Sequence, residues 1–318
     1  MTKQEKHLEW LELRRSGIGG SDISAILGMN PWSTPVDVFT SKVNPPDAED
    51  KGNLAMRIGT ELEDLVAKLF EEQTGKSVER YNKTIQDGIL LGNVDRLVVP
   101  AGSKVASHKG EIRATEGVEC KTSSDSAWAE IPLHYQLQCQ WYMGLIPSLT
   151  KMYVPVLFLK YKDFRVYELE RDQAVIDKIQ DYARKWWAKH IEAGVCPEAT
   201  TYTEASDLYP QSIRASVIAT DEVLNSVVQL GSINEQIKAL EEQADKEKTT
   251  ICEFLKDNDT LTNNQGMVLA TWKTNKDSTK VDYKGIVKEL NPDKAIIEKY
   301  TTTQAGARVF KLKNTTKE

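Results

Sequence analysis

Two oppositely charged side chains, Glu119 and Lys121, stand two positions apart in the short run GVECKTSS, and Asp95 stands in the preceding run ILLGNVDRLVVP. Successive side chains of a β-strand point to opposite faces, so a strand through GVECKTSS places Glu119 and Lys121 on one face. Carboxylate oxygens bind hard divalent cations, and an ammonium group can orient water. The three side chains suit metal-dependent phosphodiester hydrolysis, although Glu119 and Lys121 alone would equally suit a solvated ion pair.

Two strands joined as a hairpin would bring these residues together. The run 89–100 is apolar at both ends and is predicted to form a strand. The polar segment 101–116 contains two glycines and is predicted to connect this strand to GVECKTSS. This pairing places Asp95 near Glu119.

A helix from Leu54 to Gln73 supplies a further carboxylate. Its apolar residues recur at helical spacing, and Gly75 follows its end. Its polar face carries Glu61 or Glu63 beside the site, depending on the helix's rotation.

The remaining patterns complete one α/β unit. They predict a charged opening helix, a short helix from Ser21 or Asp22 to Leu27, a helix at 127–144 with Pro132 near its start, strands at 151–159 and 164–169, and a helix at 171–193. The order indicates an α+β or mixed α/β core that closes near Pro197.

A polar segment at 200–214 marks the predicted domain boundary, with one domain at 1–199 and an extension at 215–318. The extension has helical periodicity over 221–257, followed by a short strand, two short helices and another apolar run. We expect its long helix to serve as a packing or oligomer contact.

Composition is that of an ordinary soluble globular protein. The 318 residues carry a net charge of −6, which excludes a surface that is basic all round. A metal-dependent nuclease can still be acidic, because it uses carboxylates to hold cations. The four cysteines form no CxxC pair, and no apolar run of membrane-spanning length occurs, so we expect a cytoplasmic protein with reduced thiols.

Asp95, Glu119 and Lys121 have the D-x(n)-E-x-K spacing of the PD-(D/E)xK nuclease superfamily, with Val94 where a proline often stands. Four further motifs accompany the VECKTSS run in a fixed order: RRSGIGGSDISAILGMNPW, GTELEDLVAKLFEEQTG, LLGNVDRLVV and IPLHYQLQCQWYMG. Together they resemble the lambda exonuclease or YqaJ-type viral recombinase family over about the first two thirds of the chain.

The resemblance implies a restriction-endonuclease-like core, in which helices flank a central mixed sheet. It implies Mg²⁺-dependent 5′-to-3′ degradation of one strand of linear double-stranded DNA, with two ions per site and Mn²⁺ as a substitute. The product tails would serve a single-strand annealing recombinase. It also implies a ring-shaped homo-oligomer, a trimer, encoded by a phage or prophage and acting in the bacterial cytoplasm.

By the same resemblance, the metal ligands are Asp95, Glu119 and Glu63, with the backbone carbonyl of Cys120. The Cys120 side chain, on the opposite face from Lys121, is expected in the core.

Lys121 is implied to position or deprotonate the attacking water. Gln136 is implied to border Lys121 and this water, and Gln138 is a weaker candidate for that position. His134 and the pair Trp186 and Trp187 are interpreted as structural.

Arg14 and Ser21 are implied to bind the 5′-phosphate of the DNA end, and Arg15 is the close competitor of Arg14. The side-chain types support this role independently of the resemblance, because a guanidinium group and a hydroxyl group at a helix start both bind phosphate.

Two other functions remain open on the same residues. One is a structure-specific or nicking endonuclease on this core. The other is a noncatalytic DNA-binding or assembly protein with a degenerate nuclease fold.

Overall fold

The computed structural model describes residues 3–45, 53–108, 111–213, 215–303, 306 and 308–313. The chain divides into two compact units, 1–205 and 206–318, and each is described by itself. The elements up to the boundary are α1 (Lys3–Arg15), α2 (Gly20–Ile26), α3 (Pro35–Val43), α4 (Leu54–Thr74), β1 (Ser77–Glu79), β2 (Ile85–Asp87), β3 (Leu90–Gly92), β4 (Arg96–Val99), β5 (Ser107–His108), β6 (Glu111–Ile112), β7 (Glu116–Val118), β8 (Lys121–Ser123), α5 (Leu133–Leu145), β9 (Lys151–Phe158), β10 (Asp163–Glu170), α6 (Gln173–Trp187), the π-helical turn η1 (Ala188–Glu192) and α7 (Tyr202–Leu208).

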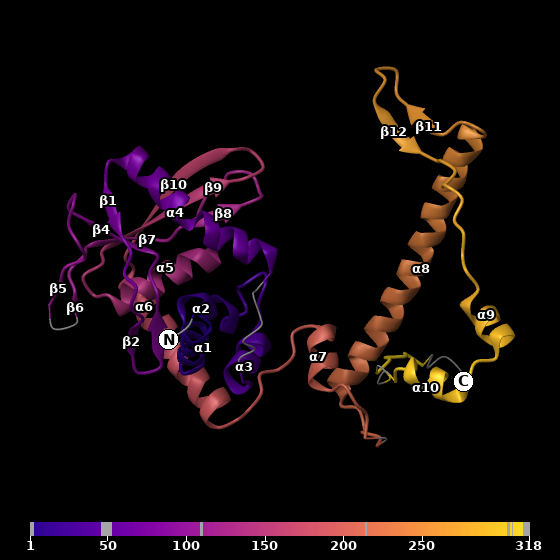
Figure 1. Cartoon of the computed structure of the whole chain (residues 1–318), viewed down its shortest axis with the longest axis horizontal. Helices are drawn as coiled ribbons and strands as arrows, with labels where there is room; N and C mark the ends of the chain where they lie inside the picture. Colours follow the sequence, from indigo (N-terminus) through magenta and orange to yellow (C-terminus); the bar gives the residue numbers. More distant parts are fainter. Residues whose placement is uncertain are drawn as a thin grey trace. The chain divides into compact units, whose positions relative to one another are not determined.

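The first unit is built on a mixed sheet with the strand order β1-β4-β7-β9-β10, and β8 also pairs with β9. β7 and β8 run parallel to β9, and the other neighbouring strands of this sheet are antiparallel. Helices lie on both sides of the sheet (Figure 1). The predicted α/β class, a central mixed sheet flanked by helices, is therefore confirmed.

Successive side chains of β9 point to opposite faces of the sheet, so this strand contributes to the core on both faces. Met152, Val154 and Val156 belong to the main cluster, which also takes residues of α2, α5 and α6. Tyr153 points to the other face, where it packs with Phe70 of α4. α5 and α4 thus cover opposite faces, and each face receives alternate side chains.

The predicted hairpin is present, but each of its strands is interrupted. The run 89–100 forms β3, which pairs with β2 outside the main sheet, and then β4, which joins the sheet. GVECKTSS forms β7 and β8, with Glu119 and Cys120 between them. β7 and β8 pair with β9 in the same register, since Val118 lies opposite Tyr153 and Lys121 lies opposite Val156.

Helix boundaries follow the capping residues. Asn53 caps α4 by accepting from Met56 N, and Gly75 ends it with φ 70°, a conformation that favours glycine. α3 was not predicted, although Thr34 and Pro35 form a standard helix start there.

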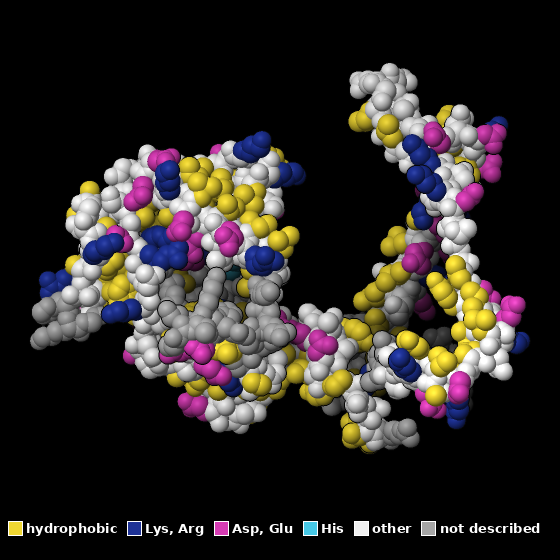
Figure 2. All heavy atoms as spheres, in the orientation of Figure 1, with side chains coloured by type: hydrophobic (Ala, Val, Ile, Leu, Met, Phe, Trp, Pro, Cys, Tyr) yellow, Lys and Arg dark blue, Asp and Glu magenta, His cyan; other side chains and the backbone are white. Residues whose placement is uncertain are grey.

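The second unit is dominated by one helix. Its elements are α8 (Asp221–Leu255), β11 (Thr260–Thr262), β12 (Val268–Thr271), α9 (Tyr283–Leu290) and α10 (Lys294–Lys299). Hydrophobic side chains are exposed along α8 (Figure 2), among them Leu224, Ile233, Ile237 and Leu240. In the described part of the chain, no helix combines the length and the apolar character that crossing a membrane requires.

Candidate active site

The hairpin of β4 and β7 brings Asp95 to Glu119 as predicted. Arg96 pairs with Val118 in the antiparallel ladder, so the next pair outward is Asp95 and Glu119. The backbone N–H of Cys120 donates to Asp95 Oδ2 at 2.8 Å. The Cys120 side chain packs with the cluster on the α4 face, as expected for a core residue. The role of its carbonyl stays a prediction.

Glu119 and Lys121 form a buried ion pair rather than a solvated one. Lys121 Nζ donates to Glu119 Oε1 at 2.8 Å, and the Glu119 and Lys121 side chains are 4% and 17% exposed. Gln138 from α5 joins them, because its Nε2 donates to Glu119 Oε1 at 2.7 Å and its Oε1 accepts from Lys121 at 3.2 Å. We call Asp95, Glu119 and Lys121 the carboxylate cluster.

Burial determines the protonation of this cluster. It raises the pKa of Asp95 well above its usual value, and the neighbouring charge of Glu119 raises it further. The pKa of Glu119 is also raised, first by burial and then by Glu63, although Lys121 opposes the shift. Burial would lower the pKa of Lys121, but Glu119 and Asp95 outweigh it and raise that pKa. Lys121 is therefore an ammonium ion at neutral pH.

Glu63 lies on α4, across the sheet from α5. Its Oε1 accepts from Arg80 at 2.8 Å and from the buried Arg96. The Leu97 side chain points into the main core, so the side chain of its strand neighbour Arg96 points to the opposite face of the sheet, which α4 covers. Glu63 still raises the pKa of Asp95 and Glu119, but two guanidinium groups hold its carboxylate.

The carboxylate cluster suits a divalent cation. Glu119 Oε2 is buried, and no hydrogen bond to it is found among the described residues. An unpartnered carboxylate oxygen beside a second buried carboxylate favours a cation there. Across the described residues, no three Asp, Glu, His or Cys side chains converge into a ready metal cage. Asp95 and Glu119 would hold the ion, with Glu63 available only on leaving its arginine partners.

Gln136 takes a different place from the one predicted. Its Nε2 donates to the backbone carbonyl of Ile131 at 2.6 Å, next to the start of α5. The glutamine that contacts Lys121 is Gln138, two residues later. Helix α5 turns Gln138 rather than Gln136 towards Glu119, and the catalytic roles of both glutamines stay predictions.

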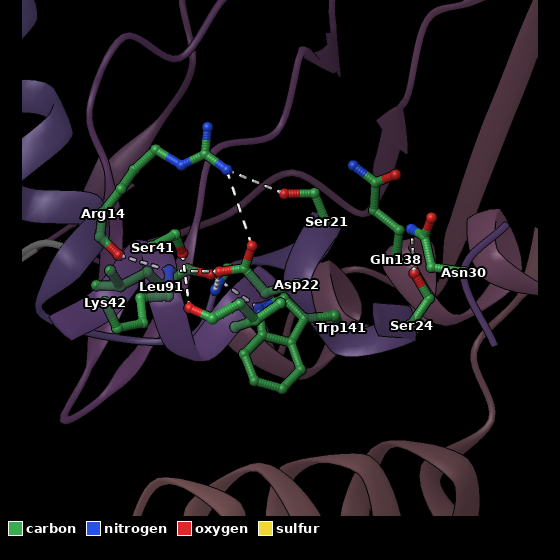
Figure 3. Close-up of polar contacts among 12 residues, drawn as sticks. Arg14, Ser21, Asp22, Ser24, Asn30, Ser41, Lys42, Leu91, Gln138 and Trp141 are labelled. Carbon is green, nitrogen blue, oxygen red and sulfur yellow. Dashed lines mark hydrogen bonds and ion pairs between the residues drawn. The ribbon is translucent and has the colours of Figure 1, made fainter. Parts of the chain in front are cut away.

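A second polar site lies at the start of α2, around a cavity of about 170 Å³ whose lining includes Trp10, Arg14, Ser21, Asp22 and Tyr142. We call it the anion cavity, after the 5′-phosphate that Arg14 and Ser21 are predicted to bind. Arg14 NH2 donates to Ser21 Oγ at 3.2 Å and lies 3.9 Å from Asp22 Oδ1, as Figure 3 shows. The predicted pair of Arg14 and Ser21 is thus brought together.

Arg15 points elsewhere. Its guanidinium group donates to Glu12 at 2.9 Å and to the backbone carbonyl of Lys42 at 3.3 Å. Of the two arginines, only Arg14 lines the anion cavity.

The buried ion pair of Lys42 and Asp22 contacts the backbone of Arg14 and holds it in place. The Lys42 side chain is 3% exposed, and its Nζ donates to Asp22 Oδ2 at 2.7 Å and to the Arg14 carbonyl at 2.8 Å (Figure 3). Asp22 Oδ2 also accepts from the Gly19 N–H at 2.9 Å. This network fixes α1 and α3 against the start of α2.

Tyr142 connects the two sites. Its hydroxyl accepts from Gln138 Nε2 at 2.9 Å, and its ring lies so close to Gly20 that a Cβ there would approach it to 2.7 Å. Sequence reasoning missed Tyr142 and the pair of Asp22 and Lys42. Spacing could have indicated Tyr142, because residues 138 and 142 share a helix face.

Comparison with known proteins relates the chain to a family. The YqaJ-like viral recombinase domain matches residues 9–146. The uncharacterized protein YqaJ of Bacillus subtilis (strain 168) is 34% identical over 264 residues, covering 78% of each chain.

Two solved structures are similar to part of the chain. An alkaline exonuclease, LHK-Exo, from Laribacter hongkongensis is 18% identical, covering 58% of this chain and 93% of its own, with a TM-score of 0.44. A phage-related exonuclease from Haemophilus somnus 129PT is 16% identical, covering 56% and 96%, with a TM-score of 0.41. On the match to its domain and the identity to YqaJ, the chain belongs to the YqaJ-like viral recombinase family.

Proposed function

We propose that this protein is a metal-dependent deoxyribonuclease that degrades one strand of linear duplex DNA from the 5′ end. The observation that supports the proposal most is the carboxylate cluster, in which Asp95, Glu119 and Lys121 lie together with an unpartnered oxygen on Glu119. Membership of a viral recombinase family supports DNA as the substrate.

Each residue has a defined part in this reaction. When bound by Asp95 and Glu119, Mg²⁺ would polarise the scissile phosphate and lower the pKa of a water molecule. Lys121 is an ammonium ion, so it would orient the water and balance phosphate charge rather than accept a proton. Gln138 holds Glu119 and Lys121 in register, because one amide contacts both.

The anion cavity favours attack from an end over attack within a strand. Arg14 and Ser21 present a guanidinium and a hydroxyl group to a cavity that Tyr142 also lines. A terminal 5′-phosphate would bind there, with the next phosphodiester at the carboxylate cluster. The protein would leave 3′ single-stranded tails for an annealing protein, and a ring-shaped oligomer, a trimer, would keep it on the duplex.

The decisive experiment uses linear duplex DNA labelled at one end or the other, incubated with Mg²⁺ and then with excess EDTA. We expect shortening from the 5′ ends with Mg²⁺ and none with EDTA. A covalently closed circle is the control substrate and should survive. Cleavage of the circle would favour an endonuclease, and binding of linear DNA without cleavage would favour a noncatalytic DNA-binding protein.

A further inference from the structure

Trp32 is a large aromatic side chain that the reaction described above does not use. It is 71% exposed, between α2 and α3. An exposed indole presents an aromatic face on which another flat ring can stack. We propose that Trp32 stacks on a nucleobase of the strand being degraded, on the 3′ side of the scissile phosphate. This inference rests on the proposed nuclease function.

The Trp32 loop is a built feature. Asn30 Oδ1 accepts from the backbone N–H groups of Trp32 at 2.8 Å and Ser33 at 3.1 Å, and Asn30 Nδ2 donates to Ser24 at 3.0 Å. The bond to Ser24 ties the loop to α2, and the other two hold the turn that carries Trp32. The indole is thus presented in one place, which lowers the entropic cost of stacking.

An aromatic chain connects Trp32 to the carboxylate cluster. The Trp32 ring packs edge-to-face on His134, with centroids 4.9 Å apart, and lies 6.3 Å from the ring of Tyr135. Lys121 Nζ lies 4.6 Å from the centroid of that Tyr135 ring. Trp32 is therefore about three nucleotides or fewer from the ammonium group, at roughly 3.4 Å per nucleotide along a strand.

Helix α5 sets the order of the three contacts. Tyr142 lines the anion cavity, Gln138 contacts the carboxylate cluster, and His134 contacts Trp32. These residues are four apart, so they share one helix face at intervals of about 6 Å. A strand with its 5′-phosphate in the anion cavity and its first phosphodiester at the cluster would continue towards Trp32.

A nucleobase fits this position better than a polypeptide does. Every base has a π-face, so stacking on tryptophan tolerates any sequence, as a degrading enzyme requires. Removing one strand also unpairs the bases near the site, which leaves their faces available. Trp32 would hold the second or third base in place for the next cleavage.

The test combines a protein change with a DNA change. Binding of a 5′-phosphorylated linear duplex is measured by fluorescence anisotropy in EDTA, using intact DNA and DNA with an abasic position at nucleotide 1, 2, 3 or 4. We expect Trp32→Ala to weaken binding of intact DNA roughly 5- to 100-fold, the range for losing one base stack. An abasic position at nucleotide 2 or 3 should weaken binding by the native protein to a similar extent. The same abasic position should cause no further loss of binding in the Trp32→Ala variant.

Three comparisons make the outcome specific. Trp32→Phe should retain most of the affinity and the abasic sensitivity, because phenylalanine can still stack. Tyr161→Ala, which removes another exposed aromatic side chain, should behave as native. The thermal midpoint of Trp32→Ala should stay close to native; a lowered midpoint with equal losses on intact and abasic DNA would mean that Trp32 only packs on His134.

The two proposals fail in different ways. If the protein degrades linear DNA while Trp32→Ala and the abasic positions act additively, the stacking inference is wrong and the nuclease proposal stands. If the native protein neither binds nor cuts DNA, the nuclease proposal itself is wrong.

Discussion

The backbone N–H of Cys120 holds Asp95 in place through a 2.8 Å hydrogen bond to Oδ2. Because the donor belongs to the segment that joins β7 to β8, the register of the sheet helps to set the position of Asp95. The cluster is thus preformed, with its charge carried by buried carboxylates whose pKa values are raised.

Replacing Asp95 with asparagine should stabilise the metal-free protein while abolishing cleavage. Asparagine keeps an oxygen for the Cys120 N–H and removes a buried charge beside Glu119. A carboxyl group with a raised folded-state pKa costs stability once pH exceeds its usual value, so the gain should appear at neutral pH and vanish in acid. We expect the thermal midpoint in EDTA to rise by roughly 2–4 °C. A lower midpoint at neutral pH would contradict this electrostatic account.

Lys121→Ala should reduce cleavage of linear DNA by roughly 100- to 1,000-fold, because it removes the ammonium that would orient water and balance phosphate charge. The protein should still fold, since Glu119 can take up a proton once its partner is lost. Single-turnover degradation of labelled duplex measures the loss. Lys104→Ala, which removes an exposed ammonium paired with Glu79, is the control and should keep native turnover.

The two glutamines of α5 provide a matched pair. Gln138→Ala should lower kcat roughly 10- to 100-fold, because the amide that aligns Glu119 and Lys121 is lost. Gln136→Ala should leave kcat nearly unchanged, at a stability cost of about 1 kcal/mol for its hydrogen bond to Ile131. Equal losses of kcat in the two variants would mean that Gln136 and Gln138 both contribute to catalysis.

The neighbouring arginines Arg14 and Arg15 test the anion cavity. Arg14→Ala should reduce the preference for 5′-phosphorylated over 5′-hydroxyl ends roughly 10- to 100-fold, since a charge-assisted contact to phosphate is removed. Arg15→Ala should retain the preference, because Arg15 contacts Glu12 and the Lys42 carbonyl instead. Competition between the two kinds of end in one reaction gives the ratio directly.

Acid should remove the contribution of the buried pair of Asp22 and Lys42. Burial alone would raise the pKa of Asp22, but Lys42 and Arg14 outweigh it and hold that pKa below 3.8. A lowered pKa means that the pair stabilises the fold above about pH 3.8 and loses its effect as pH falls further.

Asp22→Asn isolates this pair, because it leaves Lys42 as a buried charge without its partner. The variant should be less stable than native by about 3–5 kcal/mol at neutral pH. The gap should shrink as pH falls below 3.8 and should close once pH is below the lowered pKa of folded Asp22, where native Asp22 is neutral as well. Thermal unfolding of both proteins over a pH series measures it, and a gap that persists in acid would show that packing, not charge, is responsible.

Local patterns predicted most elements of the first unit. The capping signals around α4 and the continuous apolar run of β9 could be read directly, because they depend on neighbouring residues. The interruption between β7 and β8 was not predictable, since residues 119 and 120 have ordinary strand neighbours. Only the pairing with β9, which is contributed from further along the chain, decides where the ladder continues.

The amino-acid sequence by itself determined the chemistry that is present: two carboxylates and an ammonium at nuclease spacing, and an arginine beside a glycine-rich helix start. The tertiary structure decided which of the similar residues lie together: Gln138 rather than Gln136 contacts Glu119 and Lys121, Arg14 rather than Arg15 lines the cavity, and Arg96 pairs with Glu63. The physical reason is that helix rotation and the sheet face on which a helix packs depend on contacts between distant segments. Those contacts also decide which charges are buried, and therefore which carboxylates become available to hold a cation.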